Sequence, residues 1–107
     1  IEFRMPDCAA NPYTAVATAL QAAKLGIENN YDLPDAETLD CLESQSTDRH
    51  LPDNLSLALQ ALNADKVLCQ AVGQELVDNH TAIKEQEWQD FVSHTTDWEF
   101  DQYLKYI

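Results

Sequence analysis

The chain has 107 residues, 45% of them hydrophobic and 23% charged, which is the usage of a globular protein and excludes a disordered or collagen-like one. Nineteen acidic and six basic residues give a formal net charge of −13. Such a surface repels phosphate backbones and anionic lipid, so we expect neither nucleic acid nor a membrane as a partner.

The three cysteines, Cys8, Cys41 and Cys69, are odd in number and form no CxxC or Cys/His pattern of the kind that binds zinc. Widely spaced, unpaired cysteines are typical of a reducing compartment, which predicts a cytoplasmic location. No secretory signal is visible either, because no basic segment precedes an apolar stretch.

The first predicted element is a β-strand, because Ile1-Glu2-Phe3-Arg4-Met5 alternates apolar and charged residues. A lone strand leaves its backbone groups unpaired, so we expect its sheet to lie in sequence that this chain lacks. We therefore expect the chain to be a fragment. Residues i and i+2 of a strand face the same side, which places Glu2 and Arg4 on one face.

A helix is predicted to follow, with Asn11 as its N-cap and Pro12 in the first position, where a missing N–H is harmless. Its pattern fades near Asn29. One apolar face is predicted, with small residues that favour close approach to a neighbour: Ala15, Val16, Ala19, Leu20, Ala23 and Ile27. Residues 1–30 thus read as a strand plus a helix.

Residues 31–50 are predicted to form a surface loop, because they are polar and acidic and keep no period. Such a length without secondary structure is unusual inside a small compact domain. We therefore expect it to be a connection that runs over the surface of a larger protein.

Residues 51–107 are predicted to form helices. Asn54 is the expected N-cap of the first, and Asn63 or Asp65 starts a short second helix that Gly73 stops. The longest helix is predicted from about Gln74 to His94, with this apolar stripe: Leu76, Val77, His80, Ile83, Trp88, Phe91 and Val92.

The last helix is predicted to begin at a capping box, with Thr96 at the N-cap and Glu99 three residues on. The fold class is therefore mainly α, the helical part of an α+β domain, with one N-terminal strand whose sheet partners are missing. We expect Trp88 and Trp98 to pack in the core or against another subunit. Histidines on such helices are more often packed than metal-bound, so we assign no ligand role to His50, His80 or His94.

Two stretches resemble the glutamine synthetase family. IEFRMPDCAANPYTAVATALQAAKLGIENN, residues 1–30, is similar to the family segment Glu-x-Arg … Ala-Asn-Pro-Tyr-x-Ala-x-Ala … Gly-Ile-x-Asn. Residues 51–107, from LPDNLSLALQALNADK to VSHTTDWEFDQYLKYI, resemble the C-terminal helices of the family, particularly of branches that end in Thr-Asp-Trp-Glu followed by Tyr-Leu. The chain is thus identified as similar to the C-terminal part of the catalytic domain.

The resemblance implies an ATP-dependent ligase that makes a γ-glutamyl amide from glutamate and ammonia through a γ-glutamyl phosphate. It implies Mg²⁺ or Mn²⁺ with ATP in the parent enzyme, which would be a homo-oligomeric ring, a dodecamer. Glu2 matches the family's metal-binding strand glutamate, and Arg4 matches the catalytic arginine that contacts the phosphate or the glutamate substrate. A carboxylate for the cation and a guanidinium for the transferred charge suit phosphoryl transfer.

The family's other metal ligands and its ATP-contacting arginines have no counterpart in these 107 residues. We therefore expect the isolated chain to be inactive and to bind no cofactor tightly. Two alternatives stay open. The parent is a γ-glutamyl-polyamine or other amine ligase of the γ-glutamylpolyamine synthetase-like branch, or the chain is a non-catalytic helical interaction module.

Overall fold

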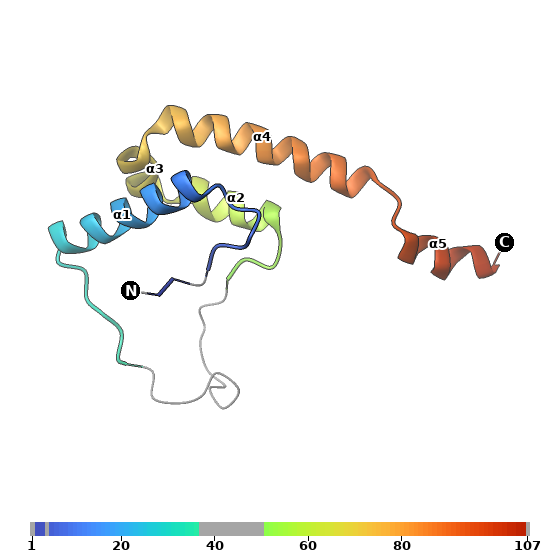
Figure 1. The fold of residues 1–107 in the computed structure, drawn as a ribbon, viewed down its shortest axis with the longest axis horizontal. Helices are drawn as coiled ribbons and strands as arrows, with labels where there is room; N and C mark the ends of the chain where they lie inside the picture. Colours follow the sequence, from blue (N-terminus) through green and yellow to red (C-terminus); the bar gives the residue numbers. More distant parts are fainter. Residues whose placement is uncertain (1, 4, 37–50, 107) are drawn as a thin grey trace.

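The structure is a computed structural model in which residues 2–3, 5–36 and 51–106 are described (Figure 1). Within these ranges the chain is mainly helical, as the sequence predicts. The elements in chain order are α1 (Pro12–Glu28), α2 (Leu55–Ala64), α3 (Lys66–Val72), α4 (Gln74–Ser93), α5 (Asp97–Tyr103) and the 3₁₀ helix η1 (Leu104–Tyr106).

Side-chain caps explain where the helices begin. The Asn11 side chain accepts hydrogen bonds from the backbone N–H groups of Tyr13 and Thr14 at 3.0 and 3.3 Å, which fixes the start of α1. Asn54 likewise accepts from the Leu57 N–H at 3.0 Å at the start of α2. These bonds satisfy donors that the first helical turn leaves unpaired. Both N-caps are confirmed as predicted.

The short helix α3 begins and ends at residues that it shares with its neighbours. Asp65 is the C-cap of α2 and the N-cap of α3, and its carboxylate accepts from the Leu68 N–H at 2.9 Å. Of the two starts that the sequence allowed, Asp65 is therefore the cap. Gly73 ends α3 and opens α4 with φ of +116°, a conformation that side chains with a Cβ rarely adopt.

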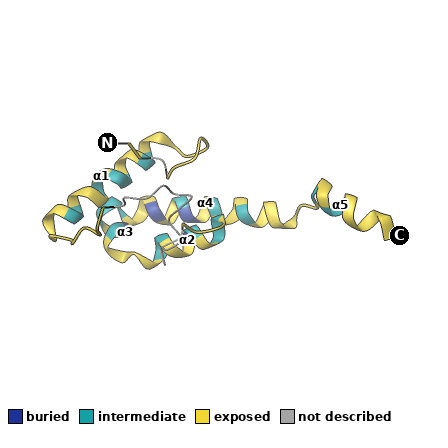
Figure 2. Cartoon of the chain, turned by 90° about the horizontal axis from the view of Figure 1, so that it is seen from below, coloured by how far each residue is buried: buried dark blue, intermediate teal, exposed yellow. Residues whose placement is uncertain are grey.

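The core lies where α2, α3 and α4 meet. Leu59, Cys69 and Val77, one from each of these helices, are the buried hydrophobic residues of the described chain, and Thr81 of α4 is buried as well. Figure 2 colours the buried parts of the helices dark blue. The Cys69 thiol donates to the Leu62 carbonyl oxygen at 3.1 Å. Among the described elements α1 packs on α3, while α2 and α3 both pack on α4.

The predicted stripe of α4 is only half correct. Val77, His80 and Trp88 are buried or half-buried as expected. The remaining inward positions are Thr81 and Lys84, and the Thr81 hydroxyl lies 3.5 Å from the Asn63 side-chain oxygen on α2. The other predicted members of the stripe are exposed: Leu76, Ile83, Phe91 and Val92. The inward face of α4 therefore includes polar residues that hydrophobicity alone does not indicate.

The predicted apolar face of α1 divides in the same way. Ala15 and Ala19 are half-buried, whereas Val16, Leu20, Ala23 and Ile27 are exposed. Helix α1 packs on α3, and of the predicted face only these two alanines are half-buried.

Helix α5 stands apart from the bundle (Figure 1), and within the described chain it contacts η1 and none of α1–α4. Its capping box is present as predicted. Trp98 is 65% exposed here, so the predicted packing of this residue has no counterpart inside the described residues, whereas Trp88 is half-buried.

The predicted N-terminal strand is not seen in the described residues. Glu2, Phe3 and Met5 form no strand, and Ile1 and Arg4 lie outside the part that the structure describes. A strand is defined by pairing with another strand, and the described chain contains none. Residues 31–36 of the predicted loop are irregular and exposed, and residues 37–50 lie outside the described ranges.

Candidate functional site

The two residues that the sequence singles out lie at the N-terminal end of the chain, ahead of α1. Glu2 is exposed, and Arg4 lies outside the described residues, so the structure does not bring the pair together in one measured geometry. Asn11, close by in sequence, uses its side chain to cap α1. The structure thus leaves Glu2 and Arg4 as a prediction from spacing and resemblance.

The described residues do not amount to a metal site of their own. No group of three or more His, Cys, Asp or Glu side chains in the described ranges could hold a metal ion. Glu2 offers a carboxylate, the hard oxygen ligand that Mg²⁺ and Mn²⁺ prefer, but an octahedral cation needs about six ligands. His80 is half-buried on α4, His94 is exposed at the end of α4, and His50 lies outside the described residues. We derive no chemical step through a metal from this chain alone.

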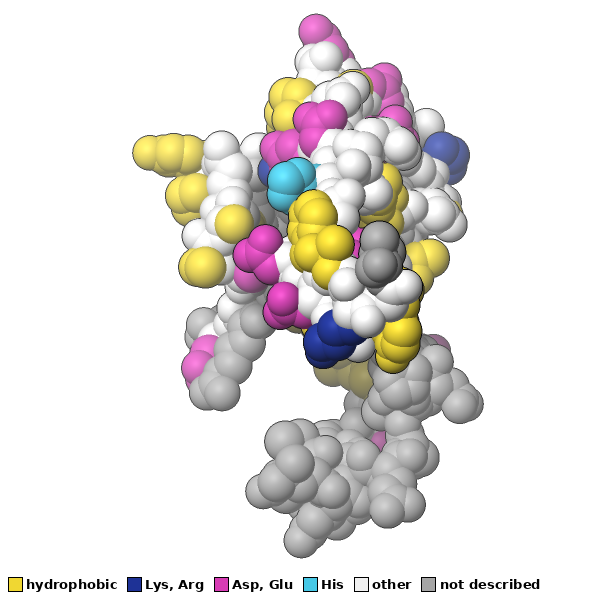
Figure 3. Space-filling model, turned by 90° about the vertical axis from the view of Figure 1, so that its right-hand side faces the viewer, with side chains coloured by type: hydrophobic (Ala, Val, Ile, Leu, Met, Phe, Trp, Pro, Cys, Tyr) yellow, Lys and Arg dark blue, Asp and Glu magenta, His cyan; other side chains and the backbone are white. Residues whose placement is uncertain are grey.

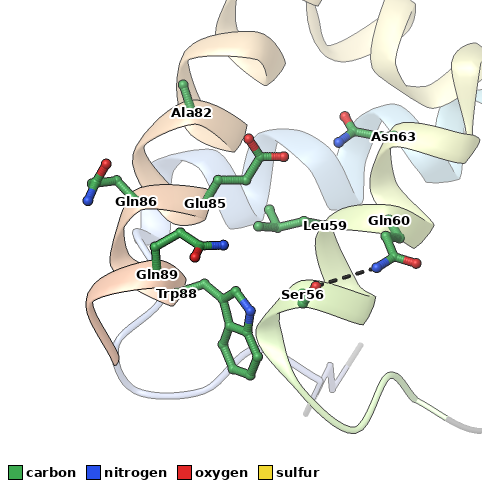
Figure 4. Close-up of a pocket in the computed structure, with 9 residues that line it drawn as sticks. All are labelled: Ser56, Leu59, Gln60, Asn63, Ala82, Glu85, Gln86, Trp88 and Gln89. Atoms are coloured by element: carbon green, nitrogen blue, oxygen red, sulfur yellow. Dashed lines mark hydrogen bonds between the residues drawn. The ribbon is translucent and has the colours of Figure 1, made fainter. Parts of the chain in front are cut away.

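A cleft of about 500 Å³ lies between α2 and α4 (Figure 4). Leu59, Glu85 and Gln89 point toward one another across it, whereas Gln86 points away. Gln60 turns aside to donate to the Ser56 hydroxyl at 3.4 Å. The residues that line the cleft are Ser56, Leu59, Gln60, Asn63, Ala82, Glu85, Gln86, Trp88 and Gln89.

The side chains that line this cleft are suited to forming hydrogen bonds. Its lining residues, all in the described part of the chain, are mostly amides and small side chains, with Glu85 the one ionisable group. Catalysis by proton transfer or by a nucleophile usually combines two or more positioned groups, and the lining of this cleft has one ionisable side chain, Glu85. This cleft was not predicted from the sequence. The pattern that could have indicated it is the recurrence of polar residues at three- and four-residue steps, as at Ser56, Gln60 and Asn63 on α2.

The clearest electrostatic feature is at the start of α5. Hydrogen bonds from the Thr96 backbone N–H and then from its hydroxyl hold the pKa of Glu99 below its ordinary value, because both favour the ionised carboxylate. The electrostatic interaction with His94 lowers the pKa of Glu99 as well. This is the arrangement of a structural cap, in which the Glu99 carboxylate is occupied by hydrogen bonds from Thr96.

The face of the molecule at the α5 end shows, among the described residues, no basic patch of the kind that holds a nucleic acid. Seen from the α5 end, acidic and apolar side chains lie next to each other while basic ones stand singly (Figure 3). Within the same residues, no helix combines the length and the apolarity that crossing a bilayer requires.

Comparison with known proteins identifies relatives along almost the whole chain. The family described as "Glutamine synthetase, catalytic domain" matches residues 1–103. The glutamine synthetase of Methanocaldococcus jannaschii is 37% identical over 112 residues, covering 99% of this chain and 25% of the relative. The glutamate–methylamine ligase of Methyloversatilis universalis is 35% identical, covering 100% of this chain and 25% of that enzyme.

A solved structure shares the fold as well. The structure titled "Apo GmaS without ligand" superposes with a TM-score of 0.87 at 38% sequence identity, covering 95% of this chain and 24% of that one. The chain therefore spans about a quarter of the length of the relatives that it matches.

Proposed function

Since this chain belongs to the glutamine synthetase family, as the C-terminal part of its catalytic domain, we propose that it is part of an ATP-dependent ligase that forms glutamine. The reaction joins ammonia to the γ-carboxylate of glutamate. The observation that supports this proposal most directly is the family match over residues 1–103, which includes Glu2 and Arg4.

Glu2 and Arg4 are the residues of this chain to which we assign roles in the chemistry. ATP with Mg²⁺ or Mn²⁺ would supply and polarise the transferred phosphoryl group. The Glu2 carboxylate would be one ligand of a cation whose remaining ligands come from the part of the enzyme that this chain does not span. The Arg4 guanidinium would hold the phosphate or the glutamate carboxylate through paired N–H donors. In the assembled enzyme the segment that holds both residues would be a strand of its sheet.

Because the remaining metal ligands lie in the part of the enzyme that this chain does not span, we predict that the isolated 107-residue chain is inactive. The described residues contain no group of three or more potential metal ligands, and the ATP-contacting groups expected from the resemblance are outside the chain. Glutamine or phosphate production by the isolated chain, given ATP, Mg²⁺, glutamate and ammonium, would contradict the proposal.

The decisive experiment uses the complete protein that carries this chain. With ATP, Mg²⁺ and glutamate, we expect ammonium to give glutamine. The variant Glu2→Gln removes the ligand charge but keeps the shape, and we expect its kcat to fall by about 100-fold or more. Glu28→Gln is the matched control, because Glu28 is an exposed carboxylate on α1 that forms an ion pair with Lys24 at 3.7 Å. Equal activity of the two variants would remove the assignment of Glu2.

A second candidate is a ligase of the same type that uses methylamine or another amine in place of ammonia. It is favoured by the glutamate–methylamine ligase and the GmaS structure, which are about as similar to this chain as the glutamine synthetase is. Assays of the complete protein with ammonium, methylamine and putrescine at equal concentration separate the two. A preference for an alkylamine or a polyamine would replace the first proposal by the second.

For the assembled enzyme we also propose a cytoplasmic, homo-oligomeric ring, in keeping with the predicted reducing compartment and with the family. Mass measurement of the complete protein by light scattering tests this. A monomeric active enzyme would exclude the ring. A complete protein that lacks ligase activity with every amine would favour the remaining alternative, a helical interaction module.

A further inference from the structure

Helix α1 carries its largest apolar side chains on the side that nothing in the described chain covers. Tyr13, Val16, Leu20 and Ile27 are 84, 59, 66 and 78% exposed. At about 100° per residue these four positions fall within about 60° of the helix circumference. We name them the α1 stripe.

The opposite side of α1 is lined mainly by small or polar residues. Its half-buried positions are Thr14, Ala15, Thr18, Ala19, Gln21, Leu25 and Gly26. They lie about half a turn from the α1 stripe, and among the described helices α3 alone contacts α1. The helix therefore buries its less hydrophobic side and exposes its more hydrophobic one. Because an apolar helix face normally lies against another element, the α1 stripe lacks its packing partner within the described chain.

Charge gives a second, independent indication. Helix α1 has one lysine and one glutamate in 17 residues, and these two form an ion pair with each other. Helix α4 carries five acidic residues and one lysine in 20 residues. In a chain of net charge −13, α1 is nearly neutral, as is α2, a helix without charged residues that packs on α4. Depletion of charge is the compositional mark of a buried interface core.

We propose that the α1 stripe is the surface on which the rest of the ligase subunit packs, namely the three quarters of a glutamine synthetase-type chain that these 107 residues do not span. This inference rests on the proposed function. The occupant follows from length, because relatives that match 98–100% of this chain are about four times as long. Phe3 and Met5, ahead of α1 in the sequence, are exposed apolar residues as well.

The first test measures thiol labelling at single positions. Leu20→Cys places a thiol in the α1 stripe, and Asp78→Cys places one on the exposed surface of α4, a helix that α1 does not contact. Each variant is labelled with a maleimide, as the isolated chain and as a chimera in which this chain replaces the last quarter of the M. jannaschii enzyme. Peptide mass spectrometry separates the new thiol from Cys8, which is also exposed.

We expect labelling at position 20 to be at least about tenfold slower in the chimera, and labelling at position 78 to be equal in both forms. Equal rates at position 20 in a folded chimera would overturn the proposal. Ligase activity is not the readout, so protection at position 20 in a chimera without activity would support the packing surface while counting against the proposed function.

A second test does not depend on the chimera folding. The isolated chain is co-expressed with the tagged first three quarters of the M. jannaschii enzyme, and co-purification is measured. Leu20→Asp with Ile27→Asp is expected to abolish co-purification while leaving the helicity of the isolated chain unchanged, because both side chains are exposed. The control pair Asn79→Asp with Gln86→Asp adds the same two charges at exposed positions of α4 and is expected to co-purify normally.

Sedimentation of the isolated chain tests the competing occupant, a second copy. If the wild-type chain is a dimer that Leu20→Asp with Ile27→Asp converts to a monomer, the α1 stripe is a contact between copies and the proposal is wrong. Absence of co-purification together with unchanged labelling of the chimera would also reject it.

Discussion

Thr96 and Glu99 satisfy each other's hydrogen-bonding groups at the start of α5. The Glu99 carboxylate accepts from the Thr96 backbone N–H at 2.7 Å and from the Thr96 hydroxyl at 2.9 Å, while that hydroxyl accepts from the Glu99 N–H at 3.2 Å. Because α5 touches none of the helices α1–α4 in the described chain, these local bonds are its main support.

Replacement of Thr96 by valine should therefore reduce the helicity of α5 and leave the stability of helices α2–α4 unchanged. The change keeps the shape of the side chain and removes the hydroxyl, which accepts from the Glu99 N–H and donates to the Glu99 carboxylate, while the backbone N–H of residue 96 can still donate to that carboxylate. We expect the NMR Cα shifts of residues 97–103 to move toward random-coil values. The thermal transition of α2–α4 should stay where it is. Thr95→Val is the control, since Thr95 is exposed and lies just outside the helix.

The same capping box predicts a dependence on pH. The bonds from Thr96 lower the folded-state pKa of Glu99 from its ordinary 4.5. The carboxylate therefore supports α5 fully at pH values above about 4.5, and this support is lost as the pH falls through the lowered pKa. A titration of the α5 shifts from pH 7 to pH 2 should show the loss. In Glu99→Gln the step should be absent, and an unchanged step would assign it to another group.

The N-cap of α1 predicts a stability change. Asn11→Ala removes the side chain that accepts from Tyr13 and Thr14, and it should destabilise the chain by about 1 kcal/mol. Asn11→Asp should retain most of the stability, since a carboxylate accepts the same bonds. Urea unfolding followed by circular dichroism measures both. Asn79→Ala, at an exposed position inside α4, is the control and should be close to neutral.

Two leucines of α2 offer a matched pair. Leu59 is 5% exposed in the core, and Leu57 is 43% exposed on the same helix. Leu59→Ala should cost about 2–4 kcal/mol, because it removes buried methyl groups and leaves a cavity, whereas Leu57→Ala should cost less than about 1 kcal/mol. Equal effects in urea unfolding would show that the core does not lie between α2, α3 and α4.

Replacing each of the two glycines by alanine should change the free energy of unfolding in opposite directions. An added Cβ at either position meets nothing within 4 Å, so backbone conformation alone decides the outcome. Gly73 has φ of +116°, and Gly73→Ala should destabilise the chain by about 1–3 kcal/mol. Gly26 lies inside α1, where Gly26→Ala should stabilise the chain by up to about 1 kcal/mol. Thermal unfolding of the two variants checks both signs.

Helix boundaries were largely predictable because caps are local. Asn11, Asn54 and Thr96 bond to backbone groups two or three residues away, so the sequence contains both partners. The inward face of α4 was not predictable in the same way. Thr81 faces inward beside Asn63, which is 18 residues distant, and hydrophobicity assigned that place to Leu76 and Ile83 instead.

From the sequence, the two candidate residues Glu2 and Arg4 could be predicted, but the geometry of the site around them could not. The spacing of Glu2 and Arg4 indicates one strand face, and the family match includes both. A strand face becomes a site only when other strands and ligands surround it. The described chain supplies neither a second strand nor a cluster of metal ligands, so the geometry of the pair stays a prediction.

The shared caps at Asp65 and Gly73 have a consequence for which changes in length the protein tolerates. With no spacer on either side of α3, one residue inserted between these caps would rotate everything that follows by about 100° and shift it by about 1.5 Å. Val77 and Thr81 would then turn out of the core. Insertions and deletions should therefore be excluded from residues 65–73 across homologous sequences, while the irregular, exposed residues 31–36 should accept them.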